Sequence, residues 1–140
     1  MGLGADARGH ARGAPAIYLD TSATYTMLSR EPEVSAVEAL FTGGVGLLSS
    51  RLLEVELHAT VDPREGSHAD VEQIMRRVDL DAVDDDLIDH ALELRAGLRA
   101  MDALHLSTAL LYGGTVTAIA THDRELASAA ERHGLALALE

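Results

Sequence analysis

The chain has 140 residues, of which 47% are hydrophobic and 24% are charged, and this is the composition of one globular domain. It contains no cysteine, which excludes disulfide scaffolds, thiolate zinc sites and cysteine nucleophiles and fits a reducing compartment. The net charge is −12, and all 11 basic residues are arginine, so the broad basic patch of many nucleic-acid binders is not expected. Without a bilayer-length apolar run or a secretory signal, we expect a cytoplasmic protein with no membrane segment.

The order of predicted elements indicates the fold class. Residues 1–14 are rich in Gly and Ala and predict a flexible tail, followed by one domain over residues 15–140. Short apolar runs predict strands at 16–19, 45–48, 78–83, 115–120 and 135–139. Helical spacing and cap residues, including Thr21 and Ser22, predict helices at 23–29, 33–41, 51–60, 67–77, 84–98, 101–112 and 124–132. This alternation predicts an α/β three-layer sandwich, with a mostly parallel sheet of about five strands and helices on both faces.

Acidic residues are expected to gather at the carboxyl edge of the sheet, where open parallel sheets bind ligands. Asp20 and Asp123 directly follow predicted strands, and Glu54 lies near the start of the helix after the second strand. Asp102 begins an otherwise apolar helix, so its carboxylate needs a partner or a metal. Carboxylates this close would repel one another and raise at least one pKa unless hard cations, Mg²⁺ or Mn²⁺, hold them. Spacing alone leaves open the alternative that they are unrelated helix caps and surface ion pairs.

Four segments of the chain carry a family resemblance. They are IYLDTSA at 17–23, SSRLLEVEL at 49–57, LRAMDALHLSTAL at 98–110 and THDREL at 121–126. In this order they resemble the PIN-domain family, and most closely the VapC ribonuclease toxins of bacterial toxin–antitoxin pairs. The resemblance covers residues 16–140 and implies a PIN-like fold. It also implies a metal-dependent endoribonuclease that hydrolyses RNA phosphodiester bonds.

The resemblance assigns roles to particular residues. It implies that Asp20, Glu54, Asp102 and Asp123 are the catalytic and metal-binding acids, supported by the hydroxyls of Ser22 and Thr121, with Mg²⁺ or Mn²⁺ as cofactor. Many family members carry a lysine shortly after the first Asp, and this chain has Tyr, Thr and Met at 25–27 instead. Contact with RNA is therefore expected from arginines such as Arg30, Arg51, Arg99 and Arg124, or from the metals.

The resemblance also implies protein partners, namely a second copy of the chain in a homodimer and a small antitoxin. An arginine of the antitoxin is expected to pair with the acidic residues, and an apolar segment to lie in a groove among the N-terminal helices. The competing hypothesis is a non-catalytic PIN-like acidic interaction module. His105, one turn after Asp102, is left open as a metal ligand, a proton carrier or a hydrogen-bonded structural group.

Overall fold

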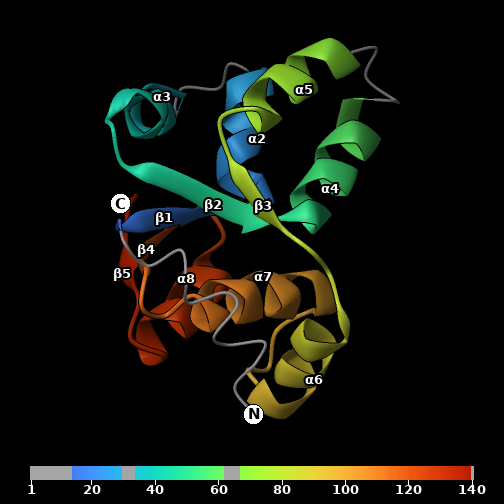
Figure 1. Cartoon of the computed structure of the whole chain (residues 1–140), viewed down its shortest axis with the longest axis vertical. Helices are drawn as coiled ribbons and strands as arrows, with labels where there is room; N and C mark the ends of the chain where they lie inside the picture. Colours follow the sequence, from blue (N-terminus) through green and yellow to red (C-terminus); the bar gives the residue numbers. More distant parts are fainter. Residues whose placement is uncertain (1–13, 30–33, 62–66, 140) are drawn as a thin grey trace.

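The computed structural model describes residues 14–29, 34–61 and 67–139 (Figure 1). Within these ranges there are five strands, namely β1 (Ala16–Leu19), β2 (Gly46–Ser50), β3 (Asp79–Asp81), β4 (Val116–Ala120) and β5 (Ala136–Leu137). The same ranges contain seven helices, namely α2 (Thr21–Ser29), α3 (Val34–Thr42), α4 (Arg51–Val61), α5 (His68–Met75), α6 (Asp85–Leu94), α7 (Ala100–Leu111) and α8 (Arg124–Arg132). Their order along the chain is the predicted one. Residues 1–13 of the predicted tail, and Arg30, lie outside the described residues.

The sheet has the strand order β3-β2-β1-β4-β5, and every pairing in it is parallel. The predicted α/β class and parallel sheet are therefore confirmed. The strands β1 and β4 are neighbours although they are far apart in sequence, with Leu19 paired to Ala120. Because parallel strands end at the same edge, the residues that follow β1, β4 and β2 are brought together there.

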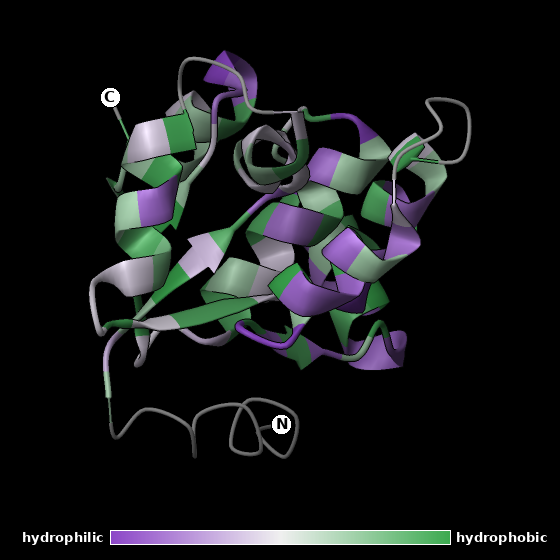
Figure 2. Cartoon of the chain, turned by 90° about the horizontal axis from the view of Figure 1, so that it is seen from above, coloured by the Kyte–Doolittle hydropathy of each residue, from purple (hydrophilic) through white to green (hydrophobic). Residues whose placement is uncertain are grey.

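Helices cover both faces of this sheet, as predicted (Figure 1). Successive residues of a strand point to opposite faces, and β1 shows this clearly. Tyr18 packs with residues of α7 and α8, whereas Leu19 packs with residues of α2 and α3. A smaller apolar cluster joins α4 and α5. The helices carry both hydrophilic and hydrophobic residues (Figure 2), as expected of helices that each cover a core on one side.

Some predicted element boundaries are wrong, for identifiable reasons. The helix α2 begins at Thr21 because the carboxylate of Asp20 accepts the backbone N–H of Ala23 at 2.9 Å, so Asp20 is the cap that was predicted at Thr21 and Ser22. The helix α6 stops at Leu94 because Arg95 takes a left-handed conformation, with φ 49° and ψ 47°. Asp84 caps the start of α6 by accepting the backbone N–H of Leu87 at 3.0 Å. No helix in the described ranges is long and apolar enough to cross a membrane.

Candidate active site

The first acidic residue, Asp20, is fixed at the carboxyl end of β1. Its backbone N–H continues the parallel ladder by donating to the carbonyl of Ala120 at 3.2 Å, and its side chain is 3% exposed. One carboxylate oxygen caps α2 through Ala23. The loop that follows β4 is thereby placed directly beside Asp20, which brings a second segment of the chain to the site.

The hydroxyls of Ser22 and Thr121 bind Asp20 from both of these segments. Ser22 donates to the Asp20 carboxylate, with its Oγ 2.8 Å from Oδ1 and 2.9 Å from Oδ2, and Thr121 Oγ1 donates to Oδ2 at 2.5 Å. Thr121 Oγ1 also accepts the backbone N–H of Asp123 at 3.0 Å. Ser22 and Thr121 therefore both contact the first acid, and Thr121 links it to the last.

The carboxylates of Asp102 and Asp123 lie on the same side of the site. Asp123 caps α8 by accepting the N–H of Leu126 at 3.0 Å, and Asp102 lies in the first turn of α7. Arg99 joins the two, with nitrogen–oxygen distances of 4.0 Å to Asp102 and 3.9 Å to Asp123. The Arg99 side chain is 81% exposed, so this long-range pairing offsets little of the repulsion between the two acids.

The helix α4 contributes Glu56 to the site instead of the predicted Glu54. Glu54 forms an ion pair with Arg51 at 2.8 Å, one turn back on the exposed surface. Glu56 accepts hydrogen bonds from Thr21 Oγ1 and, at 2.8 Å, from Nε2 of His105. Residues two apart on a helix point to nearly opposite sides, so these two carboxylates cannot serve the same site. The structure thus does not bring Glu54 to Asp20, Asp102 and Asp123.

A signal for Glu56 was present in the sequence. A helical projection of α4 places Glu56 between Leu52 and Leu53, which are both buried. The carboxylate of Glu56 therefore emerges from the face that packs on the rest of the protein. Glu54 lies beside Arg51 at the border of that face.

Two aspartates have raised pKa values, and burial contributes more to both shifts than repulsion between carboxylates does. Burial raises the pKa of Asp20, and the hydrogen bonds from Thr121, Ala23 and Ser22 oppose this only in part. Burial also raises the pKa of Asp102, and the negative charge of Asp123 adds to the effect. Repulsion was the expected cause for such a shift, and here it is the smaller one.

The pKa of Glu56 moves in the opposite direction. Burial by itself would raise it, but the hydrogen bonds from His105 and Thr21 outweigh burial and lower the pKa. Glu56 therefore stays ionised at neutral pH, next to two acids whose pKa values are raised.

The predicted arginine contacts lie at different distances from the acids. Arg99 is beside Asp102 and Asp123, as described above. Arg124 begins α8 directly after Asp123 and, with Arg132, lines a small cavity of about 320 Å³. Arg51 is exposed and forms an ion pair with Glu54. Arg99 and Arg124 are therefore the better placed of the three for contact with a substrate at the acids.

The donor chemistry of the site fits a hard divalent cation. Its candidate side-chain ligands are the carboxylate oxygens of Asp20, Asp102, Asp123 and Glu56, and oxygen ligands of this kind suit Mg²⁺ or Mn²⁺. Within the described ranges, no three His, Asp or Glu side chains already stand close enough to form a metal cage. Mg²⁺ sites commonly complete a few carboxylates with water and substrate phosphate, and the residues here are compatible with that arrangement.

Comparison with known proteins identifies the family. A description of the PIN domain matches residues 17–132, and the chain belongs to the PIN domain family. The resemblance inferred from the four sequence segments is therefore confirmed. Similar curated proteins include ribonuclease VapC46 of Mycobacterium tuberculosis strain H37Rv, which is 33% identical over 124 residues, covering 87% of this chain and 95% of that protein.

Other comparisons agree in fold and length. Ribonuclease VapC45 of Mycobacterium tuberculosis strain CDC 1551 is 33% identical over 138 residues, covering 89% of this chain and 95% of the relative. Among solved structures, PAE2754 from Pyrobaculum aerophilum superposes with a TM-score of 0.59 at 18% identity, covering 89% of this chain and 84% of the other. Because the identity to PAE2754 is only 18%, this likeness concerns the fold alone. The named relatives are ribonucleases, and the fold is the predicted PIN-like one.

Proposed function

We propose that this protein is a metal-dependent endoribonuclease and the toxin of a toxin–antitoxin pair. The observation that carries the proposal is the linkage of four acids from separate segments: Thr121 bonds to both Asp20 and Asp123, Arg99 lies beside Asp102 and Asp123, and Glu56 accepts from Thr21, the residue after Asp20. The relatives named VapC ribonucleases support the substrate class, RNA, and the toxin role is inferred from the same family. By that inference the protein also forms a homodimer.

Each residue has a role in this proposal that follows from its contacts. Asp20, Asp102, Asp123 and Glu56 would hold one or two divalent cations. Such a cation would supply a Lewis acid that lowers the pKa of a bound water molecule and offsets charge on a substrate phosphate. Ser22 and Thr121 hold the Asp20 carboxylate in one orientation. Arg99 is exposed beside two of the acids, where its guanidinium can contact a substrate phosphate.

The alternative of a non-catalytic acidic module is less well supported by the geometry. A binding surface has no need of a carboxylate as buried as that of Asp20, which is 3% exposed and carries a raised pKa. Burying an ionisable group in this way costs stability, and groups with such perturbed pKa values gather at functional sites. The two hypotheses differ in one measurable property, metal-dependent cleavage of RNA.

Chelation is therefore the first test of the function. We expect the purified protein to cleave a mixed-sequence RNA pool with Mg²⁺ or Mn²⁺, to lose this activity in EDTA, and to regain it when excess cation is restored. The Asp20→Asn variant, purified in the same way, controls for contaminating nucleases. Cleavage that persists in EDTA for the wild type but not for the variant would refute the metal mechanism. Equal activity of both proteins, or none, would favour the interaction module.

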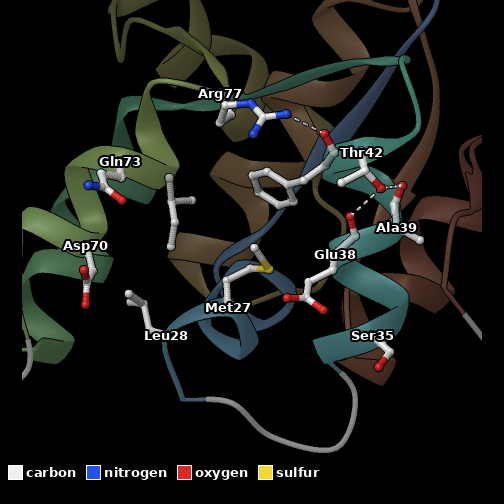
Figure 3. A pocket seen from close by; sticks show the side chains of 11 residues that line it. Met27, Leu28, Ser35, Glu38, Ala39, Thr42, Asp70, Gln73 and Arg77 are labelled. Atoms are coloured by element: carbon white, nitrogen blue, oxygen red, sulfur yellow. Dashed lines mark hydrogen bonds between the residues drawn. The ribbon is translucent and has the colours of Figure 1, made fainter.

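A groove among the N-terminal helices fits the proposed antitoxin. A cavity of about 720 Å³ lies between α2, α3 and α5 (Figure 3), and its lining includes Glu38 and Asp70 but not Asp20, Glu56, Asp102 or Asp123. Its apolar lining includes Met27, Leu28, Phe41 and Ile74. On its rim Arg77 donates to the carbonyl of Phe41 at 2.7 Å. Because α2 runs from the acidic site to this groove, over about 12 Å, one antitoxin segment could contact both.

Filling the groove is expected to weaken binding of the antitoxin. Ala39 is exposed on α3 and lines the cavity, so Ala39→Phe should occupy the groove without removing a core contact. The product of a small open reading frame next to this gene is the partner to use. We expect at least a tenfold loss of its affinity, measured by calorimetry, and no loss for Ala36→Phe, an exposed position on α3 outside the cavity. Unchanged affinity of the Ala39 variant would place the antitoxin elsewhere.

A further inference from the structure

A continuous line of hydrogen bonds runs from the core of the protein to the acidic site. Tyr18 Oη on β1 lies 2.6 Å from His105 Nδ1 on α7, and His105 Nε2 lies 2.8 Å from Glu56 Oε1 on α4. Tyr18 is fully buried and His105 is 2% exposed, whereas Glu56 reaches the surface of the site. Three elements far apart in sequence thus meet at one imidazole ring.

The chemistry of the groups fixes the direction of the hydrogen bond between His105 and Glu56 and permits Tyr18 to donate to the other ring nitrogen. An ionised carboxylate can only accept hydrogen bonds, so His105 Nε2 must carry a proton and donate a hydrogen bond to Glu56. Burial raises the pKa of Tyr18, so its phenol stays protonated and can donate a hydrogen bond to Nδ1 of His105. One neutral tautomer of His105, protonated at Nε2, therefore satisfies the whole line. Both ring nitrogens are then occupied, which leaves no lone pair with which His105 could bind a metal.

We propose that His105, oriented by Tyr18, is the residue that positions Glu56 in the acidic site. This inference rests on the proposed nuclease function and adds a residue to it. The Glu56 side chain has three rotatable bonds, and its Oε1 atom is held by hydrogen bonds from both His105 and Thr21, the residue next to Asp20. A buried Tyr and a buried His therefore both serve to orient one carboxylate, that of Glu56.

The geometry also explains why a histidine is suited to this position. Its two nitrogens lie on opposite sides of a rigid ring, so a single side chain can accept from Tyr18 and donate to Glu56 at the same time. Groups that orient a metal ligand in this way typically change metal affinity or activity by about 10–100-fold when they are removed. His105 acts through Glu56 and is therefore a positioning residue.

The test is a double-mutant cycle with two readouts, Mn²⁺ affinity by calorimetry and cleavage of mixed-sequence RNA. His105→Leu removes both hydrogen bonds, His105→Gln restores a donor toward Glu56, and Tyr18→Phe deletes a single oxygen atom. We expect His105→Leu to weaken Mn²⁺ binding and cleavage by about 10–100-fold, and His105→Gln to recover most of both. In a Glu56→Gln background, His105→Leu should change neither. Ser107→Ala, also buried on α7 but outside the line, is the matched control.

The outcomes separate this inference from the proposed function. A wild type that binds Mn²⁺ but cleaves no RNA would refute the nuclease, and the Mn²⁺ cycle would still decide the role of His105. If His105→Leu weakens Mn²⁺ binding equally in both backgrounds, or in neither, His105 does not act through Glu56. A wild type that binds no Mn²⁺ would also overturn the inference. Should His105→Leu fail to fold, Tyr18→Phe decides by the same criteria, because it leaves the ring and the packing in place.

Discussion

Glu56→Gln is expected to reduce metal-dependent RNA cleavage by at least about a hundredfold, whereas Glu54→Gln should retain nearly all of it. Both substitutions remove one charge from the same helix and keep the side-chain size. The two side chains point in different directions. Glu56 contacts Thr21 and His105 at the site, whereas Glu54 pairs with the exposed Arg51. Loss of a group that stabilises charge in the transition state typically costs ~2.7–4 kcal/mol, or two to three powers of ten in rate.

The two Glu variants serve as controls for each other. Initial rates on a mixed-sequence RNA pool with saturating Mn²⁺ measure the effect, and thermal melts verify that both variants are folded. An inactive Glu54→Gln beside an active Glu56→Gln would restore the assignment expected from the family motif and remove Glu56 from the site. Similar losses in both would mean that the charge of α4 as a whole matters more than the direction of either side chain.

Asp20→Asn is expected to raise the melting temperature of the metal-free protein at neutral pH. The folded-state pKa of Asp20 is raised, chiefly by burial, so the ionised carboxylate destabilises the fold above its unfolded pKa of about 4. The penalty grows as pH rises toward the folded pKa, and it is absent at lower pH, where both states are protonated. Asn keeps the shape and the cap on α2 without the charge.

Mg²⁺ should then stabilise the two proteins differently. At a hundred times its dissociation constant, a ligand adds about 2.7 kcal/mol to the stability of the wild type, and it should add far less to Asp20→Asn, which has lost a ligand. Melts between pH 4 and pH 7, with and without Mg²⁺, measure both effects. Asp89→Asn, an exposed position on α6, controls for the change in net charge. A metal-free Asp20→Asn that melts below the wild type, with equal gains from Mg²⁺, would contradict a cation site at Asp20.

Glu56 and Asp102 affect the pH dependence in opposite directions. The raised pKa of Asp102 destabilises the fold as pH rises above about 4, as for Asp20. The lowered pKa of Glu56 has the reverse effect, because its contribution to stability is present above its unfolded pKa and is lost as pH falls. Asp20→Asn leaves the causes of the Glu56 shift in place, but it removes the negative charge of Asp20 that helps to raise the pKa of Asp102, so relief at Asp102 adds to the expected gain.

Local sequence information was sufficient for the elements and for most of the acids. The strand β1 is a short apolar run that ends at a carboxylate, and this pattern is legible without any knowledge of the neighbouring strands. Asp102 could be singled out because a charged residue at the mouth of an apolar helix needs a partner. Arg95 shows the limit of such reasoning. Its left-handed conformation ends α6 at Leu94, although the helical pattern of the sequence continues past this point.

The sequence by itself determined the α/β class, the order of the elements and the family, because strand and helix periodicity and short ordered motifs are properties of neighbouring residues. The apolar face of α4 already favoured Glu56 over Glu54, but only the tertiary structure showed that this face meets Thr21 and His105, because that depends on how the helix packs against the sheet. The line from Tyr18 through His105 to Glu56 likewise exists only after β1, α7 and α4 have packed together. Contacts between residues so far apart in the chain are set by packing of the whole domain, and no local pattern encodes them.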